Sequence, residues 1–80
     1  MTREQVFDEV KEIFCDLLDD DDAVITEETS RENLEKWDSL FHMTLMATVT
    51  DEFSIEISTE EITDTKTVKA LVDLISERAQ

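Results

Sequence analysis

Ser39 is the residue whose setting most suggests chemistry, because its hydroxyl stands where a polar loop gives way to an apolar segment. The junction reads KWDSL at residues 36–40, and residues 39–50 contain no acidic side chain. Asp and Ser commonly open helices, since their side-chain oxygens accept from backbone N–H groups that lack intrahelical partners. A phosphate on a hydroxyl in the first turn would lie near those N–H groups and the positive end of the helix dipole. The junction therefore indicates either a capping residue, the commoner role, or an attachment site for a phosphodiester.

Other residues with chemical potential form weaker patterns. Cys15 is the only cysteine, which excludes an intrachain disulfide or a cysteine-based metal cluster, and we expect it to be a partly buried thiol beside an apolar stripe. His42, the only histidine, has no Cys or Ser partner at a recognisable motif spacing, so we expect a packing or surface residue without a catalytic part. The sequence therefore predicts no catalytic residue.

Four consecutive aspartates occupy residues 19–22 and must be tested as a calcium loop. Counted from residue 19, the run has alanine at the fifth loop position, no glycine at the sixth and serine at the twelfth, where a calcium loop needs a carboxylate. We interpret the run as a solvated turn that ends a helix, with weak, non-specific cation binding as the lesser alternative. No metal site is predicted.

Length and composition predict one helical domain. Eighty residues with 40% hydrophobic content supply a modest core but no deep catalytic cavity, which disfavours an elaborate enzyme. Glycine and proline are both absent, and with them the usual signals of β-hairpins. We expect an all-α domain over residues 1–80, a small four-helix bundle with three longer helices and one short helix.

The charge of the chain limits its partners. Twenty-two acidic residues against seven Lys and Arg give a formal net charge of -15, which repels a phosphate backbone and an anionic bilayer alike. The sequence begins without the basic and apolar regions of a signal peptide, and no apolar run is long enough to span a membrane. We expect a cytoplasmic, monomeric protein that binds neither nucleic acid nor membranes.

Capping residues and apolar spacing predict where the helices lie. The expected helix starts are at Thr2, Ser39, Ser58 and either Thr65 or Thr67. The side chains expected to form the core stripes of the three longer helices are Val6, Phe7, Val10, Ile13, Phe14, Leu17, Leu18, Leu45, Met46, Val49, Phe53, Val68, Leu71, Val72 and Ile75. Residues 23–25 are expected to form an apolar plug, and residues 53–57 a connection anchored in the core rather than a strand.

The helix that begins at Ser39 carries a second apolar row. Leu40, Met43 and Ala47 repeat at three- and four-residue intervals on the same side as Ser39, and Phe41 flanks them. A helix that is apolar on two faces is either deeply buried or offers one face to a partner. We favour exposure of this row for partner binding, and the alternative is that the long connection of residues 26–35 covers it.

Taken together, these residues resemble those of an acyl carrier protein. The resemblance covers essentially the whole chain and rests on DSL at residues 38–40, the interval from Ser39 to Phe53, FSIEI at residues 53–57 and TVxxL at residues 67–71. It implies that Ser39, with Asp38 beside it in the cofactor site, receives 4'-phosphopantetheine from coenzyme A through a magnesium-dependent phosphopantetheinyl transferase. It also implies that the terminal thiol of the arm holds an acyl or aminoacyl group as a thioester.

The function implied by this resemblance is transport rather than catalysis. A thioester on a long arm reaches several active sites without diffusing away, so the partners are enzymes that load and process the cargo. The resemblance also implies a place for an acyl chain between the helices, near residues such as Leu45, Met46 and Ile62. The rival hypothesis is a helical adaptor that is never modified and binds a partner through the row of Leu40, Met43 and Ala47.

Two features depart from the family pattern. Ser54 and Ser58 stand where members often have glycine and proline, which affects the expected turn geometry. The absence of acid from residues 39–50 differs from many fatty-acid carriers. A carrier for a specialised pathway, such as a polyketide, peptide or modified-sugar route, is therefore at least as well supported as one for fatty-acid synthesis.

Overall fold

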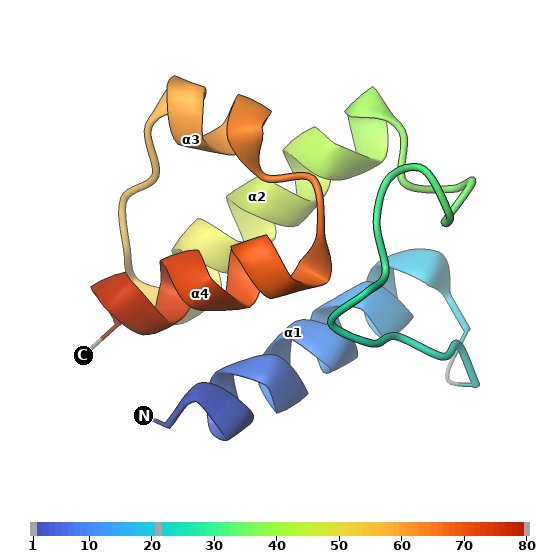
Figure 1. The fold of residues 1–80 in the computed structure, drawn as a ribbon, viewed down its shortest axis with the longest axis horizontal. Coiled ribbons are helices and arrows are strands. Elements are labelled where there is room, and N and C mark those ends of the chain that lie inside the picture. Colours follow the sequence, from blue (N-terminus) through green and yellow to red (C-terminus); the bar gives the residue numbers. More distant parts are fainter. Residues whose placement is uncertain (1, 21, 80) are drawn as a thin grey trace.

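A computed structural model describes residues 2–20 and 22–79, and these contain four helices and no strand (Figure 1). The helices are α1 (Arg3–Leu18), α2 (Ser39–Phe53), the short α3 (Thr59–Asp64) and α4 (Val68–Arg78). Helix α1 packs against both α2 and α4, and in Figure 1 α3 lies above α4 with α1 below. The predicted all-α fold with three longer helices and one short one is confirmed.

Each helix begins after a residue whose side-chain oxygen accepts from a backbone N–H of its first turn. The N-caps are Thr2, Asp38, Ser58 and Thr67. Thr2 and Ser58 form full capping boxes with Gln5 and Glu61, respectively. The predicted starts are thereby confirmed, with Thr67 rather than Thr65 opening α4 and with Asp38, not Ser39, as the cap of α2.

Two helices end in the left-handed conformation without glycine. Asp19 closes α1 at φ 55°, and Ser54 closes α2 at φ 54°. For a residue with a Cβ atom, this conformation is less stable than the right-handed helical one by roughly 1–2 kcal/mol. Ser54 therefore keeps a turn that glycine would adopt more easily. The acidic run does end α1 as predicted, although Asp21 lies outside the described residues.

The core lies between α1, α2 and α4. Val10, Phe14, Leu45 and Leu71 are among its fully buried side chains, whereas Phe53, predicted in the same stripe, is half-buried. The predicted plug at residues 23–25 is wrong in part: Ile25 is buried, but Val24 is 84% exposed. These residues belong to neither a helix nor a strand, so their side chains need not lie on one side of the backbone.

The long connection between α1 and α2 is fastened to the start of α4. Ser30 and Thr67 form an isolated bridge, Arg31 donates its N–H to the carbonyl of Lys66 over 3.1 Å, and Val68 donates to that of Thr29 over 2.8 Å. These bonds satisfy backbone groups of a segment that has no regular structure of its own. They also fix the backbone of residues 29–31 beside α4.

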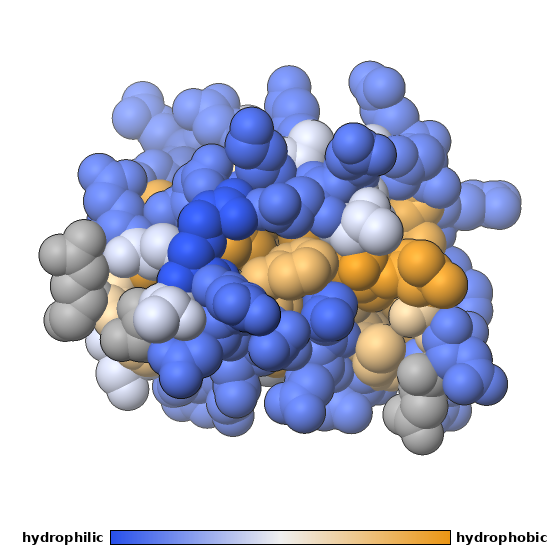
Figure 2. Space-filling view, turned by 60° about the horizontal axis from the view of Figure 1, so that its bottom comes forward, coloured by the Kyte–Doolittle hydropathy of each residue, from blue (hydrophilic) through white to orange (hydrophobic). Residues whose placement is uncertain are grey.

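Hydrophilic side chains cover most of the face drawn in Figure 2. Figure 2 shows one face of the molecule, on which a strip of apolar side chains is bordered by hydrophilic ones. Apolar atoms on the surface are ordinary in so small a domain, since there is too little polar surface to cover the core completely. Within residues 2–20 and 22–79, no helix has the length and apolar character needed to cross a bilayer.

Candidate functional site

Ser39 is the first residue of α2, and its side chain is exposed. The cap of this helix is supplied by the preceding residue, because Oδ1 of Asp38 accepts from the N–H of Phe41 over 2.9 Å. The Ser39 hydroxyl is therefore not used for capping. An exposed hydroxyl at the positive end of a helix is suited to carry a phosphate ester.

Arg31 reaches this hydroxyl from the connection. Its Nη2 donates to Oγ of Ser39 over 3.4 Å, and within the described ranges this is the one hydrogen bond that the hydroxyl makes. Among the described residues, no side chain accepts a hydrogen bond from this hydroxyl, so this part of the chain holds no general base in contact with the Ser39 oxygen. Sequence reasoning missed Arg31, because the seven residues between it and Ser39 form irregular backbone and carry no periodic signal.

A buried hydrogen-bond chain lies behind the site. Nε1 of Trp37 donates to Nδ1 of His42 over 2.9 Å, and Nε2 of His42 lies 2.6 Å from the carbonyl oxygen of Ile62. An indole N–H only donates, so Nδ1 is the acceptor and Nε2 carries the proton that is donated to Ile62. The chain thereby joins the loop before Ser39, helix α2 and helix α3.

His42, expected to be a packing or a surface residue, is a packing residue, since it is 4% exposed. Trp37 is 2% exposed, and its ring packs edge-on against Phe14 with 5.0 Å between the ring centroids. The sequence did carry one signal of the hydrogen bond between Trp37 and His42. A lone tryptophan next to a predicted helix start needs a partner for its N–H once it is buried.

The outer face of α2 presents the predicted second row to solvent. Leu40 is 78% exposed, Met43 is 58% exposed and Ala47 is exposed as well. The alternative that the connection covers this row is therefore wrong. Phe41 departs from the expected partner surface, since it is half-buried with its ring centroid 5.7 Å from that of Phe14.

Threonines complete that outer face. The hydroxyl of Thr44 donates to the carbonyl of Leu40 over 3.1 Å, and that of Thr48 to the carbonyl of Thr44 over 2.8 Å. Their donor hydrogens are thus used within α2, leaving fewer polar groups for a partner. The face contributes apolar surface without carboxylates.

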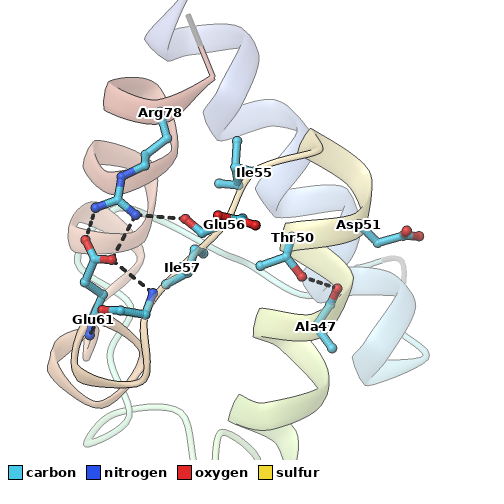
Figure 3. Close-up of a pocket in the computed structure, with 9 residues that line it drawn as sticks. Ala47, Thr50, Asp51, Ile55, Glu56, Ile57, Glu61 and Arg78 are labelled. Atoms are coloured by element: carbon cyan, nitrogen blue, oxygen red, sulfur yellow. Dashed lines mark hydrogen bonds and ion pairs between the residues drawn. The ribbon is translucent and has the colours of Figure 1, made fainter.

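A shallow pocket lies at the other end of α2, between α3 and the end of α4 (Figure 3). Arg78 closes one side of it. Its Nη1 donates to the carbonyl of Glu56 over 2.9 Å and to Oε1 of Glu61 over 2.8 Å, and its Nη2 pairs with the other oxygen of Glu61. Arg78 thereby ties both α3 and the connection before it to α4.

This pairing lowers the pKa of Glu61 to about 2, first through the hydrogen bond from Arg78 and then through that from the backbone of Ser58. A carboxylate whose pKa is depressed on folding contributes stability above its unfolded pKa and loses that contribution as the pH falls through its folded value. The contribution of Glu61 is accordingly present above its ordinary value of 4.5 and fades toward pH 2.

We expect Glu61→Gln to lower the melting temperature at about pH 6 and to have a smaller effect at about pH 3, because the carboxyl of the unfolded chain is then largely protonated and the lowered pKa of the folded state contributes less stability. Thermal melts at both pH values measure the difference between variant and wild type. Glu60→Gln is the matched control, an exposed neighbour outside the contact with Arg78. An effect of Glu61→Gln that is equal at the two pH values would contradict the assignment.

No group of three or more His, Cys, Asp or Glu side chains within residues 2–20 and 22–79 is arranged to hold a metal ion. Cys15 is a free thiol and is partly buried as predicted.

Of the predicted site residues, the structure brings Asp38, Ser39 and Leu40 together at the start of α2 and places Met43 and Ala47 farther along it.

Comparisons with known proteins agree with this arrangement. A family model described as a phosphopantetheine attachment site matches residues 8–75. The acyl carrier protein of Petrotoga mobilis is 37% identical over 79 residues, which are 98% of this chain and 92% of that protein. The acyl carrier protein of Coprothermobacter proteolyticus is 37% identical over 75 residues, covering 94% and 92% of the two chains.

Solved structures with this fold come from the same family. A solution structure of holo acyl carrier protein from Geobacter metallireducens has a TM-score of 0.82 and 34% identity, with 91% of this chain and 84% of that chain covered. A crystal structure of acyl carrier protein from Thermotoga maritima has a TM-score of 0.81 and 28% identity, with 95% and 88% covered. The chain therefore belongs to the acyl carrier protein family, whose prosthetic group is a covalently attached 4'-phosphopantetheine.

Proposed function

We propose that Ser39 carries the 4'-phosphopantetheine group and that this chain delivers acyl or aminoacyl intermediates to biosynthetic enzymes. The main observation behind the proposal is that Asp38 caps α2, so that the exposed Ser39 is not needed as the cap. The residues fit the group, since Ser39 is exposed and the guanidinium of Arg31 lies beside its hydroxyl. When attached, the group supplies the thiol that holds the cargo as a thioester.

The chain acts in this proposal as a carrier and leaves the catalysis to its partners. Oγ of Ser39 would form the bond to the phosphorus of coenzyme A nearer to the pantetheine, and the bond from that phosphorus to the adenosine bisphosphate part would break. The proton of Ser39 would leave to a base of the phosphopantetheinyl transferase, because its neighbour Arg31 donates and cannot accept. Loading and processing enzymes would then act on the arm.

Incubation with coenzyme A, magnesium and a broad-specificity transferase tests the attachment. The intact mass is expected to rise by one phosphopantetheinyl group, and fragmentation of the digested protein is expected to locate it on Ser39. Attachment to another residue would refute the assignment of Ser39. A wild-type chain that never gains the group from an active transferase would favour the unmodified adaptor instead.

The exposed row of Leu40, Met43 and Ala47 is proposed as the surface that partner enzymes contact. It starts at the residue after Ser39, so an enzyme that receives the arm also lies next to this row. Burial of apolar surface contributes roughly 25 cal/mol per Å² before the costs of association. The half-buried Phe41 would add less apolar surface than Leu40 or Met43. Contacts of this kind depend little on salt, in contrast to ion pairs.

We expect Met43→Ala to weaken binding of the holo form to its cognate enzyme by about 3- to 10-fold, mainly by faster dissociation, as for truncation of an interface hydrophobe. The matched control is Asp51→Asn, a charged residue of α2 that should mainly slow association. Binding kinetics at two salt concentrations separate the two. A steep salt dependence, with Asp51→Asn costing more affinity than Met43→Ala, would contradict the apolar docking surface.

The absence of acid from residues 39–50 also bears on the pathway. A partner that recognises a fatty-acid carrier through carboxylates on this helix would find none before Asp51. We therefore favour service in a dedicated pathway with its own enzymes. An acyl chain between the helices would have to displace side chains, because Leu45 and Met46 are buried and Ile62 is half-buried.

A further inference from the structure

We propose that Arg31 binds the phosphodiester of the attached arm and fixes the direction in which the arm leaves α2. The proposal rests on attachment at Ser39, as argued above. Arg31 would be a positioning residue, since it contacts the linkage between protein and arm but takes no part in forming or breaking a bond.

The first support is the contact itself. Nη2 of Arg31 lies 3.4 Å from Oγ of Ser39, the atom that becomes the ester oxygen. The unesterified phosphate oxygens would lie two bonds from Oγ, joined to it through the phosphorus. A guanidinium that already touches Oγ reaches them by rotation of its own side chain. Its planar, forked N–H groups match a phosphate better than an ammonium does.

The second support is that no carboxylate among the described residues neutralises this charge. The chain holds 22 acidic residues, yet no carboxylate of the described ranges pairs with Arg31. The other two arginines behave differently: Arg3 pairs with Glu27 and Asp73, and Arg78 pairs with Glu61. Arg31 alone among the arginines is directed at a hydroxyl instead of a carboxylate.

The third support is the position of its backbone. The N–H of Arg31 is bonded to the carbonyl of Lys66, and the adjacent Ser30 forms the bridge with Thr67. Asn33 Nδ2 further donates to the carbonyl of Glu28 over 3.1 Å, which braces the same turn. Arg31 is thus presented from a fastened backbone, so less conformational entropy is lost when its side chain binds a ligand.

A physical consequence follows for the arm. The phosphodiester adds one negative charge to a chain that already carries -15, and repulsion alone would destabilise the modified protein. Arg31 offsets this charge locally. It also holds the phosphate end of the arm near the connection between α1 and α2. The row that begins with Leu40 and Met43 then stays uncovered for a partner.

The test is a thermodynamic cycle between modification and the Arg31 side chain. Melting temperatures are measured for the unmodified and modified forms of the wild type, of Arg31→Gln and of Lys36→Gln. Lys36 is the matched control, an exposed cation of the same connection without a salt bridge among the described residues. In low salt, modification is expected to lower the melting temperature of Arg31→Gln by about 4 °C more than that of the wild type or Lys36→Gln.

High salt should remove this difference by screening. Equal effects of modification on the wild type and Arg31→Gln in low salt would overturn the proposal. A second measurement needs no variant: the side-chain ¹⁵N–¹H signal of Arg31 is expected to shift when the wild type is modified, and an unchanged signal would also overturn it. Failure of the attachment itself is recognised separately, because the wild type would then gain no mass.

Discussion

Replacing Ser39 with alanine is expected to abolish the gain of 4'-phosphopantetheine completely, because the substitution removes the only atom to which the phosphorus would be joined. The change should leave the fold intact. The cap of α2 is the carboxylate of Asp38, and the Ser39 hydroxyl bonds only to Arg31 among the described groups. We expect the free energy of unfolding to change by no more than about 0.5 kcal/mol, as for other surface substitutions.

Two controls make this result specific. Ser30→Ala removes the hydroxyl of another serine near Arg31 and should leave modification unchanged. Asp38→Ala should instead destabilise α2 by about 0.5–2 kcal/mol, the usual cost of losing an N-cap. Intact mass and thermal melts measure the two effects separately. Modification of Ser39→Ala at the wild-type level would show that another residue carries the arm.

The expected effects at Asp38 and Ser39 differ, and this difference shows which helix caps can be predicted from neighbouring residues and which cannot. A cap depends on a few adjacent residues, so Thr2 and Ser58 could be identified as helix starts from their own neighbourhoods, whereas the start of α4 could be either Thr65 or Thr67. At residues 38 and 39, however, two adjacent residues could both serve as the cap. The geometry of the turn decides between them and leaves the serine free.

Contacts between residues that are separated by irregular backbone could not be predicted from adjacent residues in this way. The bond from Arg31 to Ser39 requires the connection to fold back beside α4, through pairings that join residues 27–31 to residues 66–69. Neither periodicity nor composition encodes those pairings. The same limit explains Val24, whose apolar type suggested burial although the path of the backbone turns it outward. Sequence patterns therefore predicted the helices, while the surroundings of Ser39 needed the tertiary structure.

The second large effect is expected at Trp37, a buried residue two positions before Ser39. Truncation of a buried aromatic side chain to alanine costs about 3–5 kcal/mol. An 80-residue domain has a total stability of about 4–12 kcal/mol, by the usual range per residue. Trp37→Ala should therefore remove a large share of the total stability, and a domain at the low end of that range would be largely unfolded at room temperature. It cannot by itself separate the lost packing from the lost hydrogen bond to His42.

Trp37→Phe isolates the hydrogen bond, because phenylalanine keeps an aromatic ring but has no N–H. Nδ1 of the buried His42 would then lack its donor, at a cost of about 1–3 kcal/mol in addition to the smaller ring. Urea unfolding measures this loss, with Val24→Ala on the exposed surface as the control. A loss below about 0.5 kcal/mol for Trp37→Phe would show that the hydrogen bond contributes little to stability.

The effect of Trp37→Phe should also extend to α3, and this distinguishes a connected chain of bonds from simple packing. His42 donates to the carbonyl of Ile62, and none of the residues of α3 is buried. A helix with so little buried surface depends on its few specific contacts and opens readily when one is weakened. We therefore expect amide hydrogen exchange in α3 to accelerate more than exchange in α4. Uniform acceleration in both helices would mean that the substitution lowers global stability without releasing α3.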